Sequence, residues 1–322
     1  MMDLCDYKII VTGGAGFLGR VVVNRLKEKS VNPIIIRSQD YDLTTESGVS
    51  KMYETYKPDI VLHLAAVVGG IGINRSKPGT FFYKNIMMGT LLQEYANRHR
   101  IKKFVAIGTI CAYPKHTPVP FKEDDLWAGY PEETNAPYGL AKKMMLVQSQ
   151  AYRQEFGFNG IYLLPVNLYG PGDNFNPESS HVIPAIIKKI LDAKSAGLDH
   201  IECWGTGSAT REFLYVDDAA EAIVMATEMY DSPMPLNIGS GTEISIKKLT
   251  EIIIKLCDYT GEIRWNQDYP DGQPRRCLDV TNAKLALGFV SKTCLLDGLT
   301  ETIRWYKEHI HGRNTSIAGG IN

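Results

Sequence analysis

Four side chains in two short segments have the types and spacing needed to pass a proton to a carbonyl group. Tyr138 and Lys142 are four residues apart in "NAPYGLAKKMML", so a helix would place both on one face. A lone tyrosine, with a pKa of ~10, stays protonated at neutral pH, but a neighbouring ammonium favours the phenolate. Such a tyrosine could protonate a carbonyl oxygen during reduction. Thr109 and Cys111, in "GTICAYP", follow an apolar run. The alternative for Tyr138 and Lys142 is a pair on a helix surface that takes no part in a reaction. The alternative for Cys111 is a buried thiol that only packs in the core.

The elements that must position these side chains alternate between short apolar runs and longer amphipathic segments. Strands that are apolar on both faces and separated by helix-length crossovers are typical of a parallel sheet covered on both sides. We therefore predict an α/β fold with a doubly wound parallel (Rossmann) sheet. The expected strands lie within 7–14, 32–38, 59–66, 102–109 and 160–170, and the expected helices lie within 19–29, 47–57, 89–100 and 138–156.

A second, smaller part is expected after the first sheet. From about residue 171 the pattern changes to loops rich in Gly, Pro and Asn, mixed with short helices and strands. We predict a nucleotide-binding domain over 1–172 and a smaller α/β substrate-binding domain over 173–322. The segment 213–238 is helical and apolar enough to return to the first domain, so the second domain would be discontinuous.

Three glycines in "YKIIVTGGAGFLGR" lie between the first predicted strand and its helix. Gly13, Gly16 and Gly19 would permit a tight turn and bring the pyrophosphate of a dinucleotide to the helix N-terminus. An ordinary strand-to-helix turn is the alternative. At the end of the second strand, where NAD-binding chains usually place an acid, this chain has Arg37. We therefore predict NADP(H) rather than NAD(H), unless Arg37 is a solvated loop residue.

Composition limits the classes of partner. The chain has 322 residues, with 35 Lys and Arg against 36 Asp and Glu and a net charge of −1, so no overall field favours nucleic acid or anionic lipid. The six cysteines show no paired metal-ligand spacing, and no stretch has the length of a membrane span. We expect a cytoplasmic protein without bound metal, nucleic acid or membrane.

The longer motifs resemble a known superfamily. "TGGAGFLG", "LHLAA", "YGLAK" and "REFLYVDDAAEA" resemble the extended short-chain dehydrogenase/reductases, which act on nucleotide sugars. "CAYPKHTPVPFKEDDLWAGYPEETNAPYG" and "PVNLYGPGDNFNPESSHVIPAII" are similar to the GDP-L-fucose synthases in particular. The resemblance covers nearly the whole chain. It implies conversion of GDP-4-keto-6-deoxy-D-mannose to GDP-L-fucose, by C3 and C5 epimerisation and NADPH-dependent reduction of C4.

The resemblance also implies roles for individual residues. Cys111 and His181 would exchange the C3 and C5 protons. Thr109, Tyr138 and Lys142 would take part in the reduction of the C4 carbonyl. For the cofactor it implies Gly13, Gly16, Phe17, Leu18, Gly19, Arg37, Asp42, Leu43, Ala65, Ala66, Tyr138, Lys142, Pro165, Asn167, Leu168 and His181. For a GDP-linked or other nucleotide-diphosphate sugar it implies Asn167, Lys189, Trp204, Arg211 and, as a further diphosphate contact, Arg275.

Some features of the chain depart from that family and leave alternatives open. The glycine loop lacks the histidine and arginine usual there, Thr109 replaces a serine, and Lys189 stands where an arginine is usual. A lysine is a less specific diphosphate ligand than a guanidinium. The alternatives are a 4-reductase or epimerase acting on another 4-keto-6-deoxy sugar, or a non-catalytic dinucleotide-binding regulator. A homodimer is expected, because members of this superfamily often pair through a four-helix bundle and 138–156 is apolar enough to contribute.

Overall fold

A parallel sheet of six strands forms the larger part of the protein. The structure, a computed structural model, describes residues 2–269 and 271–311. The strand order is β2-β1-β3-β4-β5-β9, and every neighbouring pair is parallel. The predicted doubly wound sheet is therefore confirmed. The strands are β1 (Ile9–Thr12), β2 (Ile34–Ile36), β3 (Ile60–His63), β4 (Lys103–Ile107), β5 (Gly160–Pro165) and β9 (Leu236–Ile238).

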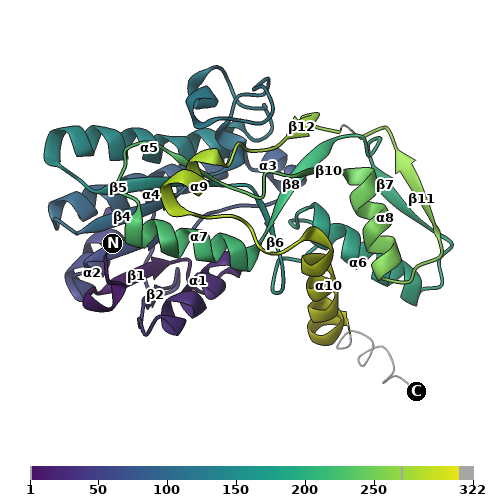
Figure 1. The fold of residues 1–322 in the computed structure, drawn as a ribbon, viewed down its shortest axis with the longest axis horizontal. Coiled ribbons are helices and arrows are strands. Elements are labelled where there is room, and N and C mark those ends of the chain that lie inside the picture. Colours follow the sequence, from purple (N-terminus) through teal and green to yellow (C-terminus); the bar gives the residue numbers. More distant parts are fainter. Residues whose placement is uncertain (1, 270, 312–322) are drawn as a thin grey trace.

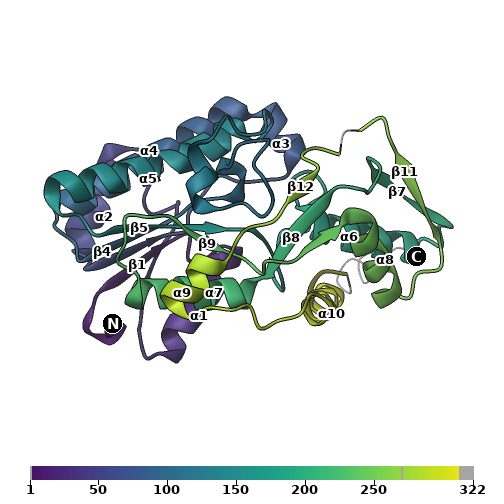
Figure 2. The same ribbon diagram turned by 45° about the horizontal axis from the view of Figure 1, so that its top comes forward.

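Helices cover both faces of this sheet, as Figures 1 and 2 show. One layer holds α2, α4 and α5, and the other holds α1, α7 and α9. The short helix α3 precedes α4 at one end of the first layer. The bounds are α1 (Phe17–Glu28), α2 (Glu46–Tyr56), α3 (Ile71–Ser76), α4 (Pro78–Arg98), α5 (Ala136–Phe156), α7 (Val216–Met229) and α9 (Thr281–Leu287).

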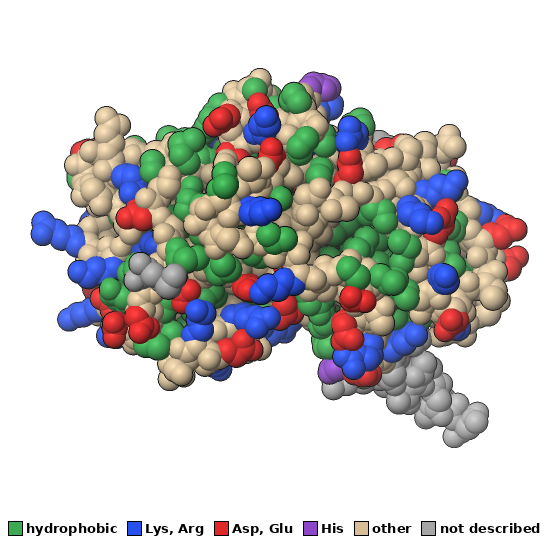
Figure 3. Space-filling view, in the orientation of Figure 1, with side chains coloured by type: hydrophobic (Ala, Val, Ile, Leu, Met, Phe, Trp, Pro, Cys, Tyr) green, Lys and Arg blue, Asp and Glu red, His purple; other side chains and the backbone are tan. Residues whose placement is uncertain are grey.

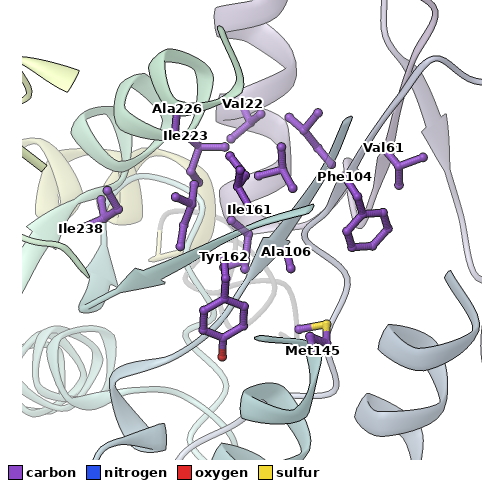
Figure 4. Close-up of a cluster of buried hydrophobic side chains, with 14 of the residues drawn as sticks. Val22, Val61, Phe104, Ala106, Met145, Ile161, Tyr162, Ile223, Ala226 and Ile238 are labelled. Atoms are coloured by element: carbon purple, nitrogen blue, oxygen red, sulfur yellow. The ribbon is translucent and has the colours of Figure 1, made fainter. Parts of the chain in front are cut away.

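The core explains why the central strands are continuously apolar. All residues of β1, β3, β4 and β5 are buried, because helices pack on both sides of the sheet. In Figure 4, Val22 of α1 and Ile223 of α7 lie on one side of the strands and Met145 of α5 lies on the other. The sheet is thus a rigid platform whose strand ends can carry a site.

The smaller part is built on β8 and on a separate two-stranded sheet. β8 (Thr210–Tyr215) pairs with β6, β10 and β12, and β7 pairs with β11. Helices α6, α8 and α10 surround these strands and bury a second apolar cluster. The remaining bounds are β6 (Asn167–Tyr169), β7 (His200–Trp204), β10 (Glu243–Ser245), β11 (Glu262–Asn266), β12 (Arg275–Arg276), α6 (Val182–Ser195), α8 (Ile246–Leu256) and α10 (Leu295–Tyr306). Short turns of helix are η1 (Leu4–Asp6), η2 (Ile110–Ala112), η3 (Glu123–Trp127) and η4 (Lys307–His311).

The chain crosses between the two parts several times. β6 joins the small sheet, β9 closes the large one, and α9 returns to pack on α7 and β9. Of the predicted return over 213–238, residues 213–215 belong to β8, α7 packs on α1 and β9 joins the large sheet, and the return of α9 was not anticipated. These pairings show which sheet each segment joins, and a domain limit at 172–173 stays a prediction.

The surface carries mixed charge. On the face shown in Figure 3, Lys and Arg side chains are interspersed with Asp and Glu, with no large area of one sign. Within residues 2–269 and 271–311, every helix is too short or too polar to cross a bilayer.

Candidate active site

One large cleft runs from the end of the parallel sheet into the smaller part. Its volume is about 1670 Å³, above the range of roughly 300–1,000 Å³ typical of small-molecule pockets. Its walls come from the loops after β1, β2, β3 and β4, from the N-terminal half of α5, from α6 along its length, and from β7, β8 and β12. The cleft therefore has room for two extended ligands placed end to end.

The glycine loop forms one end of this cleft. Gly13 has a φ of +71°, and a Cβ on it would lie 2.7 Å from the backbone nitrogen of Ala65. Only glycine fits there, because the loop after β1 touches the loop after β3 at the point where the strand order reverses. Gly16 caps α1, whose first residues are Phe17 and Leu18. The expected loop residues Gly13, Gly16, Phe17, Leu18, Gly19, Ala65 and Ala66 all line the cleft.

The end of β2 forms the adjoining wall. Arg37 follows β2 directly and is exposed, so its guanidinium is available to an anion at the cleft. Asp42 accepts hydrogen bonds from the hydroxyl of Thr44 (2.7 Å) and from its backbone nitrogen (3.0 Å), which lower the pKa of the carboxyl. Leu43 is buried beside it. Arg37, Asp42 and Leu43 line the cleft, as do Pro165, Asn167 and Leu168 from β5 and β6.

Tyr138 and Lys142 lie on one face of α5 and both line the cleft. Tyr138 is 8% exposed and Lys142 is 2% exposed. Burial lowers the pKa of Lys142 to about 7. Burial also raises the pKa of Tyr138, as does the nearby Cys111, while a hydrogen bond with the Thr109 side chain opposes the rise.

The expected lowering of the Tyr138 pKa by Lys142 is therefore not seen in the protein alone. The same burial that affects the phenol removes much of the charge from the ammonium near neutral pH. Among the described residues, no atom forms a hydrogen bond or ion pair with the Lys142 ammonium. Tyr138 is thus held protonated, which suits an acid.

The loop after β4 positions Thr109 and Cys111 beside Tyr138. The Thr109 hydroxyl accepts from the Cys111 backbone nitrogen (3.2 Å) and caps the turn η2. A Cβ on Gly139 would lie 2.3 Å from the Cys111 carbonyl oxygen, so only glycine lets α5 approach this turn. Thr109 is buried, Cys111 is partly buried, and both line the cleft. Sequence analysis had not singled out Gly139.

His181 reaches the same cleft from the smaller part. It is the N-cap residue of α6, and its side chain is accessible through the cleft but closely surrounded by protein, which lowers its pKa. At neutral pH it is therefore largely uncharged, and it must first take up a proton to act as an acid.

The far end of the cleft carries three of the residues expected to meet the nucleotide sugar. Trp204 is 59% exposed and stacks on Tyr269, with ring centroids 4.3 Å apart. Lys189 donates to the Glu202 carbonyl oxygen (2.5 Å) and lines the cleft. Burial and the like charge of Arg276 lower the pKa of Arg211 to about 10, so it remains a cation at neutral pH.

Arg275 is the expected site residue that the structure places elsewhere. Its guanidinium is exposed and pairs with Glu243, and it does not line the cleft. The next residue, Arg276, is buried and does line it. Successive side chains of a strand point to opposite faces, so only one arginine of β12 can face inward. The sequence analysis named Arg275 as a diphosphate contact, whereas its neighbour Arg276 is the one that lines the cleft.

The cleft fits a dinucleotide. The glycine loop brings backbone to the N-terminus of α1 without intervening side chains, Arg37 offers a cation at the β2 end, and Lys142 lines the same cleft. These features match the groups of a phosphorylated nicotinamide dinucleotide. No group of three or more His, Cys, Asp or Glu residues in the described chain could hold a metal ion.

Known proteins with similar sequences and structures share this architecture. Residues 9–239 match the NAD dependent epimerase/dehydratase family. The chain is 39% identical over 305 residues to putative GDP-L-fucose synthase 2 of Arabidopsis thaliana, covering 94% of this chain and 92% of that protein. It is 32% identical to GDP-L-colitose synthase of Yersinia pseudotuberculosis, covering 93% and 97%. A GDP-L-fucose synthetase structure from Naegleria fowleri bound to NADP superposes with a TM-score of 0.87 at 26% identity, covering 95% of each chain.

Proposed function

The chain belongs to the NAD-dependent epimerase/dehydratase family, and we propose that it is an NADP(H)-dependent epimerase/reductase that converts GDP-4-keto-6-deoxy-D-mannose to GDP-L-fucose. One observation carries the proposal. A single cleft joins the glycine loop, the Tyr138–Lys142 pair, Cys111, His181 and Arg211. Reduction alone would use the glycine loop, the Tyr138–Lys142 pair and the phosphate contact Arg211, and would need neither Cys111 nor His181.

The epimerisation half of the reaction uses Cys111 and His181. A ketone at C4 acidifies the hydrogens on C3 and C5, so a base can remove each proton and an acid can return one to the opposite face. We assign these two roles to the thiol and the imidazole. Thr109 and Tyr138 donate hydrogen bonds to the C4 oxygen while it carries enolate charge, which is where fixed donors stabilise most.

The reduction half uses Tyr138. Bound NADPH would supply hydride to C4. The glycine loop would hold the NADPH, and Arg37 would contact its 2′-phosphate. Tyr138, which the protein keeps protonated, gives its proton to the C4 oxygen. Lys142 then faces the phenolate, and the negative charge favours protonation of its amine. Because both side chains are buried, the phenolate and the ammonium interact in a medium of low dielectric constant and are little screened by water.

The remaining cleft residues would bind the nucleotide diphosphate. Arg211 is a half-buried cation suited to charge-assisted bonds with phosphate oxygens, and Lys189 adds a second positive charge. The exposed ring of Trp204 offers a stacking surface for a base. We place Asn167 between cofactor and sugar.

The decisive test is turnover with defined stereochemistry. Purified full-length protein is mixed with NADPH and GDP-4-keto-6-deoxy-D-mannose, NADPH oxidation is followed by absorbance, and the product is identified by NMR. We expect GDP-L-fucose. A product with unchanged C3 and C5 configuration would assign a plain 4-reductase, and no NADPH consumption would overturn the proposal.

Another GDP-linked keto sugar is the second candidate. The similarity to GDP-L-colitose synthase favours it, since relatives with that name and relatives named for fucose match this chain over comparable lengths. The same assay with a panel of GDP- and dTDP-linked 4-keto-6-deoxy sugars separates the candidates by their kcat/KM.

We also propose a cytoplasmic homodimer. All six cysteines are free, which suits a reducing compartment. Helices α4 and α5 pack together and expose large apolar side chains, among them Phe82, Tyr83, Val147 and Phe156. Light scattering on the purified protein would measure the mass, and a monomer would contradict the dimer.

A further inference from the structure

Arg276 lines the cleft, and its guanidinium is held by Gln273, a residue that no motif in the sequence pointed to. It is 8% exposed, and its Nε donates to the Gln273 side-chain oxygen (2.7 Å). Gln273 is itself 5% exposed and donates to the Lys115 carbonyl oxygen (2.8 Å). In the register of β12 and β8, Arg276 lies beside Arg211. The guanidinium is therefore fixed in direction before any ligand binds.

The other end of this guanidinium faces the thiol of Cys111. The distance from Arg276 Nη1 to Cys111 Sγ is 3.6 Å. A neutral thiol is a weak acceptor, but a thiolate accepts a charge-assisted bond from a guanidinium. Arg276 is always charged, so a thiolate at this position would accept a charge-assisted bond from a fixed donor.

We propose that Arg276 is a positioning residue for epimerisation, which holds the Cys111 sulfur in the cleft and stabilises its thiolate. This inference rests on the proposed function of the site. The thiolate lone pair forms an S–H bond as a C–H bond next to the C4 ketone breaks, and the electron pair of that bond moves to the C4 oxygen. The negative charge thus passes from sulfur to the enolate, and the thiol proton later returns to solvent.

Other polar and charged side chains also lie near Cys111. Arg211 adds a second positive charge, and the Tyr138 hydroxyl is uncharged at neutral pH. Glu132, the nearby anion, is occupied by hydrogen bonds from Thr134 (2.7 Å) and Asn135 (2.5 Å). Glu132 and Asp271 both act electrostatically on Arg211, whereas Arg276 is the cation that lies 3.6 Å from the sulfur.

A diphosphate contact is the competing role for Arg276, and four measurements at pH 7 separate the two. The first is deuterium incorporation at C3 and C5 of GDP-4-keto-6-deoxy-D-mannose in D₂O without NADPH. The second is oxidation of GDP-L-fucose by NADP⁺, which needs no epimerisation. The third is the Kd for GDP, and the fourth is the rate of Cys111 alkylation by iodoacetamide, read from its peptide by mass spectrometry.

Arg276→Met removes the guanidinium and keeps most of the stem. We expect deuterium incorporation to fall ~10–100-fold, the loss of one hydrogen bond to a charged group. Cys111 alkylation should slow several-fold, while GDP-L-fucose oxidation and the Kd for GDP stay within about twofold. Arg276→Lys should keep part of the incorporation, because it retains the charge without the fixed fork.

Arg275→Met is the matched control, since the neighbouring arginine pairs with Glu243 outside the cleft. It should behave as wild type in all four measurements. Unchanged incorporation in Arg276→Met, or a Kd for GDP that weakens as much as incorporation falls, would overturn the inference. If Arg276→Met does not fold, equal losses in all four readouts for Arg276→Lys would overturn it. Absence of deuterium incorporation in wild type would instead refute the proposed function.

Discussion

Two reactive pairs share the cleft but are built in opposite ways. Tyr138 and Lys142 come from one turn of α5, and burial alone dominates their chemistry. Cys111 and Arg276 are 165 residues apart in sequence and meet between the loop after β4 and the strand β12. At neutral pH the phenol of the first pair is protonated and its amine is only partly charged, whereas the second pair always contains a cation.

This difference matches the charge that each step must handle. An acid that protonates an alkoxide should be neutral until hydride arrives, and burial without an ionic partner keeps it so. A base that removes a carbon-bound proton should be anionic beforehand, and a fixed guanidinium favours that form. One cleft can thus run both steps if it keeps the two pairs electrostatically distinct.

The largest effect should come from removing the acid. Tyr138→Phe keeps the ring but loses the proton, so reduction of the keto sugar should fall ~10²–10⁴-fold. Deuterium incorporation at C3 and C5 should fall much less, since Thr109 still donates to the enolate oxygen. Steady-state NADPH oxidation and NMR in D₂O measure the two. Near wild-type kcat in this variant would remove Tyr138 from the mechanism.

Cys111→Ser should produce the opposite split. A serine hydroxyl is a far weaker base than a thiol, whose pKa of ~8.5 supplies thiolate at neutral pH. Deuterium incorporation should fall by ~10²-fold or more, the typical contribution of a positioned base. NADP⁺-dependent oxidation of GDP-L-fucose should continue, and His181→Asn should resemble this variant rather than Tyr138→Phe. If Cys111→Ser lost deuterium incorporation and GDP-L-fucose oxidation to the same extent, Cys111 would not act in epimerisation alone.

Lys142→Met tests whether burial is what lowers the pKa of Lys142 in the Tyr138–Lys142 pair. The pKa of Lys142 is about 7 in the folded protein and ~10.5 in an unfolded chain, so the unfolded state binds more protons between these pH values. The contribution of Lys142 to the free energy of unfolding of the wild type therefore rises as the pH increases from about 7 to ~10.5. The variant should be more stable than wild type by a few kcal/mol at pH 7, and the difference should shrink towards pH 10. Urea unfolding without added cofactor measures it.

A destabilised Lys142→Met at pH 7 would show instead that the ammonium gains a favourable partner in the folded protein. Comparison of the two proteins at each pH removes the contribution of other titrating groups. Reduction should be lost in this variant whatever its stability, because the phenolate then lacks its neighbouring amine.

Arg37→Ala should give the smallest effect. Only NADPH presents a 2′-phosphate, so its Kd should weaken ~10-fold, about the value of a hydrogen bond to a charged group, while the Kd for NADH changes little. Fluorescence titration measures both. Equal losses for the two cofactors, or an initial preference for NADH, would mean that Arg37 does not read the extra phosphate.

Much of the fold followed from local patterns in the sequence. The continuous apolar runs of β1, β3, β4 and β5 indicated strands buried on both faces, and the structure places them side by side in one parallel sheet. The return of α9 to the large part was not predicted, because a seven-residue helix after an irregular segment carries too little periodicity to reveal its packing.

The chemistry of the site was determined in part by sequence alone. The spacing of Tyr138 and Lys142 places them on one face of any helix, and the glycines before α1 specify a close backbone turn. These are local properties, set by the periodicity of the helix and by the absence of a side chain. Only the tertiary structure decided that burial keeps the phenol protonated and removes part of the charge from the amine, and that Arg276 rather than Arg275 faces Cys111. Desolvation and strand orientation depend on neighbours far along the chain, and no local pattern records them.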